Sequence, residues 1–265
     1  MKTVLLIGRA CRFSPHSEAK DEAILREVGR QLSEKGWQTI IINEEEVWPT
    51  SLHIDLCLSM GRLPSTLHRL AQWQAEGMRV INNPQGVELC CHRLRLFNLL
   101  ERQEVSVPPA KGDDGYWLKR GDGVAETCND VLFAANEKEM LIQQQSMRQR
   151  GINKIYVCAH LKGDLLKFYG VEHAHFFSYF YPGDDGQWKF DDEKRNGVPQ
   201  HYAFNIEQLK ALAHRAAELT GIDVYGGDCI VDEKGQISLI DFNDWPSFSR
   251  CREEAAKAIA EMLDN

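Results

Sequence analysis

The sequence predicts an α/β protein that begins with a parallel sheet and continues into smaller strand-rich units. In the first third, the apolar run "TVLLIG" is followed by a helical pattern over residues 18–35 and then by "TIIIN". The runs "IDLCLSM" and "MRVIN" continue this alternation, with a helical segment between them. Strands that alternate with helices indicate a parallel sheet covered on both faces. We therefore expect residues 1–86 to form an N-terminal Rossmann-like lobe.

The remaining chain divides into two further predicted units. A helical pattern follows Asn83 and Pro84, a typical helix start, and "VSVPPAKGDDG" then provides a Pro- and Gly-rich connection. The short apolar runs beyond it indicate a small lobe, so residues 87–145 are interpreted as a linking helix and lid. Residues 146–265 form the expected C-terminal lobe, which contains a hairpin near its end and a closing helix from Arg252.

Composition excludes several classes of protein. The chain has 265 residues, 43% of them apolar, which is enough for a substantial core. Its net charge of −8 argues against general binding to nucleic acid or to a membrane surface. No apolar run approaches the roughly 20 residues that span a bilayer, and the one at the N-terminus is too short for a signal peptide. Eight cysteines without C-x-x-C spacing predict reduced thiols, no zinc site and a cytoplasmic location.

The segment "GGDCIVDEKGQISLIDFND" carries the clearest chemistry. A short turn near Lys234 and Gly235 would join two antiparallel strands, which places Asp228 opposite Asp241. Asn243 falls on the same strand face as Asp241, because side chains alternate along a strand. Carboxylate and amide oxygens suit Mg²⁺, which is usually shared with phosphate oxygens. The alternative interpretation is a surface hairpin with scattered acids.

This pattern resembles the metal-binding end of the ATP-grasp superfamily, of the kind found in glutathione synthetase ATP-binding domains. Asp228 is followed thirteen positions later by Asp241, then by Asn243 and a nearby Pro. Most members carry Glu where this chain has Asp241, and the Asp-x-Asn form is similar to inositol polyphosphate kinases. The resemblance covers nearly the whole chain. It implies a three-lobed ATP-grasp fold with ATP as cofactor and with Asp228, Asp241 and Asn243 as ligands of Mg²⁺, for which Mn²⁺ can substitute.

The same resemblance implies a set of nucleotide-binding residues. Arg93 stands where many members carry a phosphate-binding Lys, and Lys119 in "YWLKRGDG" matches a lysine of the lid strand. Gly121 and Gly123 resemble the glycine-rich loop that covers the phosphates. The segment "LIQQQSM" is similar to the hinge that contacts adenine, which assigns Gln143, Gln144 and Gln145 to this role; a solvated strand end is the alternative.

Further residues are implied for the reaction and for the acceptor. Lys167 resembles a basic residue that can face the transferred phosphoryl group, although an exposed strand lysine fits equally well. Arg195 and Asn196 are similar to an Arg-x-Asn step near the acylphosphate, with different spacing. For the acceptor, the candidates are Arg9, Arg12 and His16 in the first loop, with Ser14 and Ser17, together with Ser247 after the metal motif. A solvated loop with a helix-capping serine is the alternative for the first loop.

The resemblance implies an ADP-forming ligase that joins a carboxylate to an amine, or to a thiol, through an acylphosphate. Gly226 occupies the position at which D-alanine ligases carry Arg, which favours ligases of the glutamate-adding kind. Small-molecule carboxylates and amines are the expected partners, and a homodimer is one expected assembly. A small-molecule kinase is the first alternative, opposed by the few basic residues in the acceptor region. A catalytically inactive nucleotide-binding regulator is the second, opposed by the retained metal motif.

Overall fold

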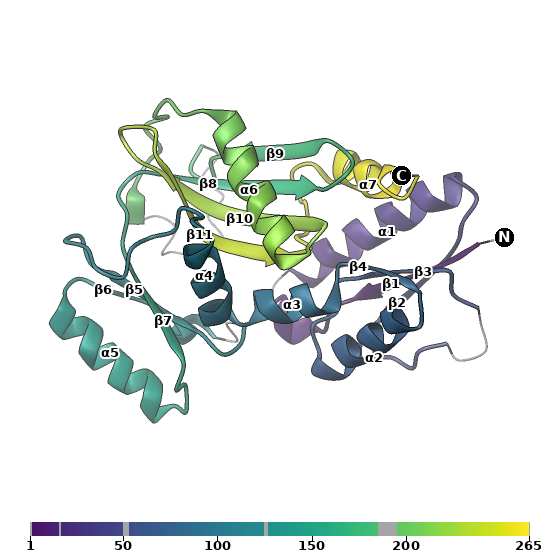
Figure 1. Ribbon diagram of the computed structural model, residues 1–265, viewed down its shortest axis with the longest axis horizontal. Coiled ribbons are helices and arrows are strands. Elements are labelled where there is room, and N and C mark those ends of the chain that lie inside the picture. The colour runs from purple at the N-terminus through teal and green to yellow at the C-terminus, as the bar shows by residue number, and fades with distance from the viewer. Residues whose placement is uncertain (1, 16, 50–52, 125–126, 185–194, 265) are drawn as a thin grey trace.

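The computed structural model describes residues 2–15, 17–49, 53–124, 127–184 and 195–264. Over these residues the chain forms three sheets, each accompanied by its own helices (Figure 1). The first is parallel and the other two are antiparallel. The α/β class and the N-terminal parallel sheet predicted from the sequence are confirmed.

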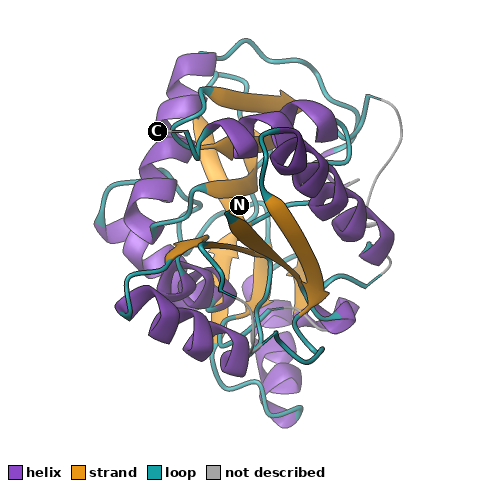
Figure 2. Cartoon of the chain, turned by 90° about the vertical axis from the view of Figure 1, so that its right-hand side faces the viewer, coloured by secondary structure: helices purple, strands orange, loops and turns teal. Residues whose placement is uncertain are grey.

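The N-terminal lobe is built on a buried parallel sheet of order β2-β1-β3-β4. Its strands are β1 (Thr3–Gly8), β2 (Gln38–Asn43), β3 (Leu56–Ser59) and β4 (Arg79–Ile81). Alternate residues of β1 point to opposite faces, so Val4 and Leu6 pack toward α1 (Glu18–Glu34), whereas Leu5 and Ile7 pack toward α2 (Pro64–Ala75). Figure 2 shows helices on either side of these strands.

Two helices connect this lobe to the lid. Helix α3 (Pro84–Cys91) starts where the sequence predicts, because the Asn83 side chain accepts a hydrogen bond from the Gln85 amide at 2.9 Å and Pro84 occupies the first turn. Helix α4 (Arg93–Arg102) follows directly. The lid sheet has the order β6-β5-β7. Its strands are β5 (Tyr116–Arg120), β6 (Val131–Ala134) and β7 (Ile155–Ala159), with helix α5 (Glu137–Gln149) packed against β5 and β6.

The C-terminal lobe has an antiparallel sheet of order β11-β10-β8-β9. Its strands are β8 (Asp164–Val171), β9 (Phe176–Phe180), β10 (Val224–Val231) and β11 (Ile237–Asp244). Helix α6 (Ile206–Thr220) covers one face, where it shares a core with Phe168, Leu239 and Phe242. Helix α7 (Arg252–Glu261) packs against α1 and so joins this lobe to the N-terminal one (Figure 1).

The chain passes from the lid to the C-terminal lobe later than the sequence predicts. Strand β7 pairs with β5 of the lid, so the passage lies at residues 160–163, between β7 and β8. The predicted boundary after residue 145 falls inside α5. The Asn136 side chain caps this helix by accepting from the Glu139 amide at 3.0 Å, and the polar residues that follow are good helix formers.

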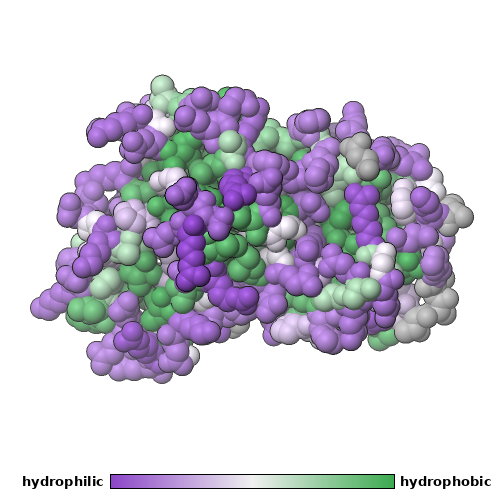
Figure 3. Space-filling view, viewed as in Figure 1, coloured by the Kyte–Doolittle hydropathy of each residue, from purple (hydrophilic) through white to green (hydrophobic). Residues whose placement is uncertain are grey.

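The surface is polar over much of its area. Hydrophilic residues predominate on the face shown in Figure 3, with hydrophobic residues visible in patches between them. No helix among the described residues has the length and apolar character needed to span a bilayer. The seven cysteines whose side chains are described are free thiols, as expected from the sequence.

Gly86 gives a test of how closely α3 and α6 pack. A Cβ atom at this position would lie 2.2 Å from the carbonyl oxygen of Thr220, at the end of α6. We expect Gly86→Ala to lower the free energy of unfolding by about 1–3 kcal/mol, because backbone cannot move aside as a flexible side chain can. Urea unfolding would measure the change. Gln85→Ala, on the exposed side of the same helix, is the control, and equal values for both variants would contradict the predicted packing.

Candidate active site

Three charged residues form a row across neighbouring strands of the C-terminal sheet. Lys167 of β8 lies opposite Asp228 of β10, and Asp228 lies opposite Asp241 of β11. The predicted register of the hairpin, with the two aspartates facing each other, is confirmed. Asn243 is two residues beyond Asp241 and therefore shares its face. This face is opposite to the one that packs on α6.

A β-bulge in β11 brings Asp241 into this row. Cys229 pairs with Leu239, but the next pair is Asp228 with Asp241, so Ile240 is the extra residue. The carbonyl oxygen of Ile240 accepts a hydrogen bond from Lys119 Nζ at 2.8 Å. The lid strand β5 thus reaches the C-terminal sheet through Lys119, and burial, the largest influence on this ammonium group, lowers its pKa.

Arg93 reaches the row from the start of α4. Its Nη2 lies 3.4 Å from both carboxylate oxygens of Asp241. Burial alone would raise the pKa of Asp241, but the positive charges of Arg93 and Lys119 outweigh it and lower the pKa from 3.8 to about 2. Asp241 is therefore ionised at neutral pH, as a metal ligand has to be.

Lys167 pairs with the other carboxylate. Its Nζ lies 3.2 Å from Oδ1 and 3.1 Å from Oδ2 of Asp228. Lys167 is thus not the exposed strand lysine of the alternative interpretation, since its side chain is only 17% exposed. With Arg93 and Lys119 beside the row, two carboxylates lie among three basic groups from α4, β5 and β8.

The two glycines after β5, Gly121 and Gly123, differ in whether their surroundings leave space for a side chain. A Cβ atom on Gly121 would lie 2.9 Å from Leu94 Cβ and 3.0 Å from the Lys154 carbonyl oxygen, so close packing against α4 requires glycine there. A Cβ atom on Gly123 would meet only side-chain atoms of Arg120, at 3.6 Å or more. The packing around Gly123 would therefore accept a Cβ atom, whereas that around Gly121 would not.

Other residues assigned from the sequence lie apart from the row. Gln143, Gln144 and Gln145 are within α5, so they do not form the passage between the two lobes; the Gln143 side chain donates to the Phe133 carbonyl at 2.7 Å.

Arg195 lies over the Phe133 ring, 3.6 Å from its centroid. Arg195 and Asn196 line a cavity of about 320 Å³ with His160, Lys162, Gly163, Asp164, Gln200 and Tyr202. This cavity is at the passage between β7 and β8.

The described residues of the first loop do not gather the predicted acceptor side chains into one site. Arg12 is exposed and stacks on Phe13, with 4.9 Å between the guanidinium carbon and the ring centroid. Ser17 precedes α1 without capping it through its side chain, and His16 is outside the described residues. Ser247 is half-buried beyond the end of β11. These residues are not brought into contact with one another by any hydrogen bond that the structure shows among the described residues.

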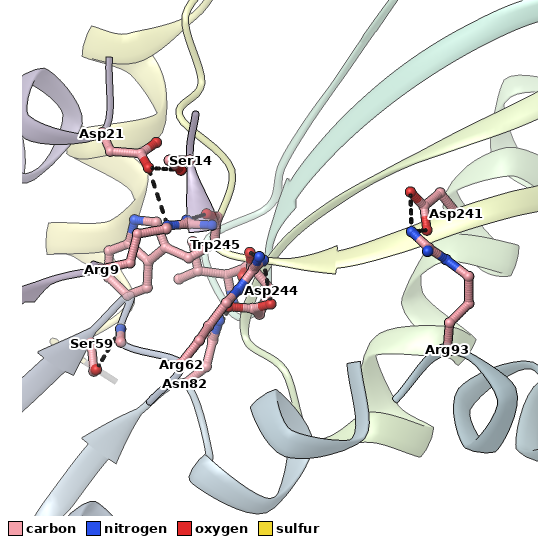
Figure 4. A network of polar contacts seen from close by, with 12 residues as sticks. Arg9, Ser14, Asp21, Ser59, Arg62, Asn82, Arg93, Asp241, Asp244 and Trp245 are labelled. Atoms are coloured by element: carbon pink, nitrogen blue, oxygen red, sulfur yellow. Dashed lines mark hydrogen bonds and ion pairs between the residues drawn. The ribbon is translucent and has the colours of Figure 1, made fainter. Parts of the chain in front are cut away.

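The structure instead reveals a buried polar cluster that the sequence did not predict. Arg62, just after β3, forms a bidentate pair with Asp244, the last residue of β11 (Figure 4). Arg9 donates to the Trp245 carbonyl oxygen and forms an ion pair with Asp21 at 3.1 Å. Figure 4 shows this cluster at the N-terminal lobe and the Asp241–Arg93 pair further along β11. The sequence signals were the position of Asp244 directly after Asn243 and the first-loop residues Arg9 and Ser14, which contact Asp21 here rather than standing free for an anion.

Similar solved structures give a consistent picture of the fold. The chain matches the D-alanyl-alanine synthetase A of Vibrio cholerae with a TM-score of 0.71 at 11% identity, over 99% of this chain and 96% of that one. It matches a RimK domain ATP-grasp protein of Sphaerobacter thermophilus with a TM-score of 0.66 at 15% identity, over 99% and 100%. For the D-alanine–D-alanine ligase of Bacillus anthracis, solved in complex with ATP, the TM-score is 0.66 at 10% identity, over 100% and 97%.

The chain has the ATP-grasp fold. The three-lobed architecture expected from the sequence motifs is therefore confirmed. No model of a protein family matches the sequence, and no curated protein does. At identities of 10–15% the shared feature is the fold, so the chemistry has to be argued from the residues that this ATP-grasp chain places together.

The lowered pKa of Asp241 predicts how stability depends on pH. A carboxylate with a lowered folded-state pKa stabilises the protein above its ordinary pKa of 3.8, and this contribution is lost as pH falls through about 2. Wild type should exceed Asp241→Asn in unfolding free energy by on the order of 2 kcal/mol near neutral pH. The difference should shrink toward zero as pH falls from about 4 to about 2.

Urea unfolding of both proteins across this range measures the effect. Glu233→Gln, at the exposed tip of the same hairpin, is the matched control and should differ from wild type by a small, nearly constant amount. A difference between wild type and Asp241→Asn that stays constant on acidification would show that the carboxylate is not stabilised by Arg93 and Lys119.

Proposed function

We propose that this chain is an ATP- and Mg²⁺-dependent ligase that activates a small carboxylate as an acylphosphate and joins it to an amine. The observation that carries the proposal is the row of Asp228 and Asp241 with Asn243 alongside, faced by basic groups from three elements. Oxygen donors beside fixed positive charges are what phosphoryl transfer requires. The solved proteins of the same fold include D-alanine–D-alanine ligases, which supports a ligase.

In this proposal, Arg93, Lys119 and Lys167 bind the phosphates of ATP, and Gly121 and Gly123 belong to the loop above them. The base lies toward the passage at residues 160–163, where the cavity with Arg195 and Asn196 offers room. Asp164 at its edge is three residues from Lys167 on β8, roughly 10 Å along the strand, which a nucleotide can span. Arg195 and Asn196 would then contact the nucleotide rather than the reacting atoms.

The donor set fits Mg²⁺. Among the described residues no three His, Cys, Asp or Glu side chains form a cluster suited to a metal. The set proposed here is smaller, with two carboxylates and the Asn243 amide, as expected for an ion that keeps waters and shares phosphate oxygens. Bound Mg²⁺ would neutralise phosphate charge during transfer. The basic partners of Asp228 and Asp241 keep both carboxylates paired until ATP supplies phosphates for the same basic groups.

The reaction proceeds in two displacements. A carboxylate oxygen of the acceptor attacks the γ-phosphorus of ATP, the bond from that phosphorus to the ADP oxygen breaks, and an acylphosphate forms. The amine then attacks the acyl carbon, phosphate leaves with the electron pair of the broken C–O bond, and the amine loses a proton. Lys167 would stabilise the charge on the transferred phosphoryl group, while Arg93 and Lys119 hold the phosphates in place. We expect the acceptor between the first loop and Ser247.

A kinase is the second candidate. The observation that favours it is Asp241 at the position where most ligases of the superfamily carry Glu. In that case a hydroxyl of the acceptor replaces the carboxylate, and the phosphoryl group stays on the product.

Nucleotide binding gives the first test. We expect Mg²⁺ with ATP to raise the midpoint of thermal unfolding, because a ligand at about 100 times its dissociation constant stabilises by about 2.7 kcal/mol. ATP with a chelator should raise it less. Asp228→Asn should remove the Mg²⁺-dependent part of the shift, whereas the control Glu233→Gln should keep it. A normal shift in Asp228→Asn would show that Asp228 is not a metal ligand.

Product analysis separates the candidate reactions. With Mg²⁺, ATP and a panel of small carboxylates and amines, the ligase should form ADP and phosphate in equal amounts. It should do so only when a carboxylate and an amine are both present. A kinase would form ADP without phosphate. Nucleotide binding without any ADP formation across a broad panel would favour a regulator.

A further inference from the structure

The contact between Arg62 and Asp244 joins the N-terminal lobe to the end of strand β11. Arg62 Nη2 lies 2.7 Å from Asp244 Oδ1, and Nε lies 3.1 Å from Oδ2. The side chains are 9% and 1% exposed, so the pair is shielded from water and from salt. A planar guanidinium fork matched to a carboxylate fixes orientation as well as distance.

Arg62 is itself held in place by the N-terminal sheet. The buried Glu44, directly after β2, accepts from the backbone amides of Arg62 at 2.8 Å and Leu63 at 2.7 Å through Oε2. Its Oε1 accepts from the Ala10 amide at 2.7 Å. One carboxylate thus ties together the segments that follow β1, β2 and β3, and the Arg62 side chain projects from this fixed point.

A second arginine supports the next residue of the same segment. Arg9 donates to the carbonyl oxygen of Trp245, and the Trp245 amide donates to Val224 at 2.8 Å. Trp245 is fully buried and has a φ of 33°, a conformation that a large side chain adopts only where its surroundings impose it. Residues 244 and 245 are therefore both fixed by side chains from the N-terminal lobe.

The charges in this cluster argue against a site for an anionic acceptor. Arg9 and Arg62 are the buried cations, and they are matched by the buried carboxylates of Asp21, Asp244 and Glu44. No excess positive charge is left among these residues to hold a further carboxylate. These side chains instead pair with one another and contact neighbouring backbone.

We propose that Arg62 is a positioning residue, which acts through Asp244 to hold Asn243 where it meets the Mg²⁺ bound with ATP. This inference rests on the proposed function. Asn243 needs such support because β11 is an edge strand that pairs, among the described strands, with β10 alone, and Asn243 is next to the last residue of the strand. The end of an edge strand frays unless something outside the sheet holds it. The N-terminal lobe thereby supports a residue of the nucleotide site.

The test is calorimetric titration of the full chain with ADP, in Mg²⁺ and in chelator. Arg62→Lys keeps the charge and loses the fork, so the affinity for ADP with Mg²⁺ should fall about tenfold, as expected when a partner that orients a metal ligand is removed. The affinity in chelator should stay unchanged. Lys35→Met is the matched control: Lys35 also joins the two lobes, through the Ala260 carbonyl at 3.0 Å, but away from β11. Lys35→Met should gain as much affinity for ADP from Mg²⁺ as wild type does.

The outcomes separate this inference from the proposed function. If wild type gains affinity from Mg²⁺ and Arg62→Lys gains as much, Arg62 does not position Asn243. An equal loss in Mg²⁺ and in chelator would point to a general opening of the site and would also overturn the inference. If wild type itself gains nothing from Mg²⁺, the proposed function fails first. Should Arg62→Lys fail to fold, Asp244→Asn, which keeps the size of the side chain, is read in the same way.

Discussion

The pairing register of β10 and β11 is the constraint on which the rest of the site depends. The proposed function requires Asp228 and Asp241 to lie directly opposite each other, and in a sheet a shift of one residue turns every side chain to the other face. The core under α6 fixes that register, because Leu239 and Phe242 have to be buried there. Packing on one face of the sheet thus decides the chemistry on the other.

Charge balance explains how so many ionised groups can lie together half-buried. The two carboxylates are neutralised by Arg93, Lys119 and Lys167, each from a different element, so none of these charges is buried alone. The excess of positive charge suits a ligand that brings several negative charges of its own. In the proposed function, the site is therefore complementary to a metal–nucleotide complex rather than to a metal ion alone.

The sequence predicted the parts of the site that depend on local pattern. The apolar alternation predicted the parallel sheet, and the hairpin "GGDCIVDEKGQISLIDFND" predicted the opposed aspartates, because strand period and turn length determine register. Contacts between distant segments could not be predicted, such as Arg62 with Asp244, 182 residues apart. Gln143–Gln145 were misplaced because three glutamines fit a helix surface as well as a strand, and only tertiary pairing puts β7 in the lid sheet.

The bulge at Ile240 lets the two halves of β11 place their apolar residues on the same face of the sheet, although these residues do not alternate regularly across Ile240. Leu239 and Phe242 both face the core although they are three residues apart, which a regular strand cannot achieve. If Ile240 were paired as in a regular strand, either Phe242 would leave the core or the acids would enter it. Deleting Ile240 would give a regular strand with the same core face and the same acids, and would remove the carbonyl group that accepts from Lys119 of the lid. The extra residue thus adds to the strand a contact with the lid, while the acids keep the side of the sheet that the proposed function requires.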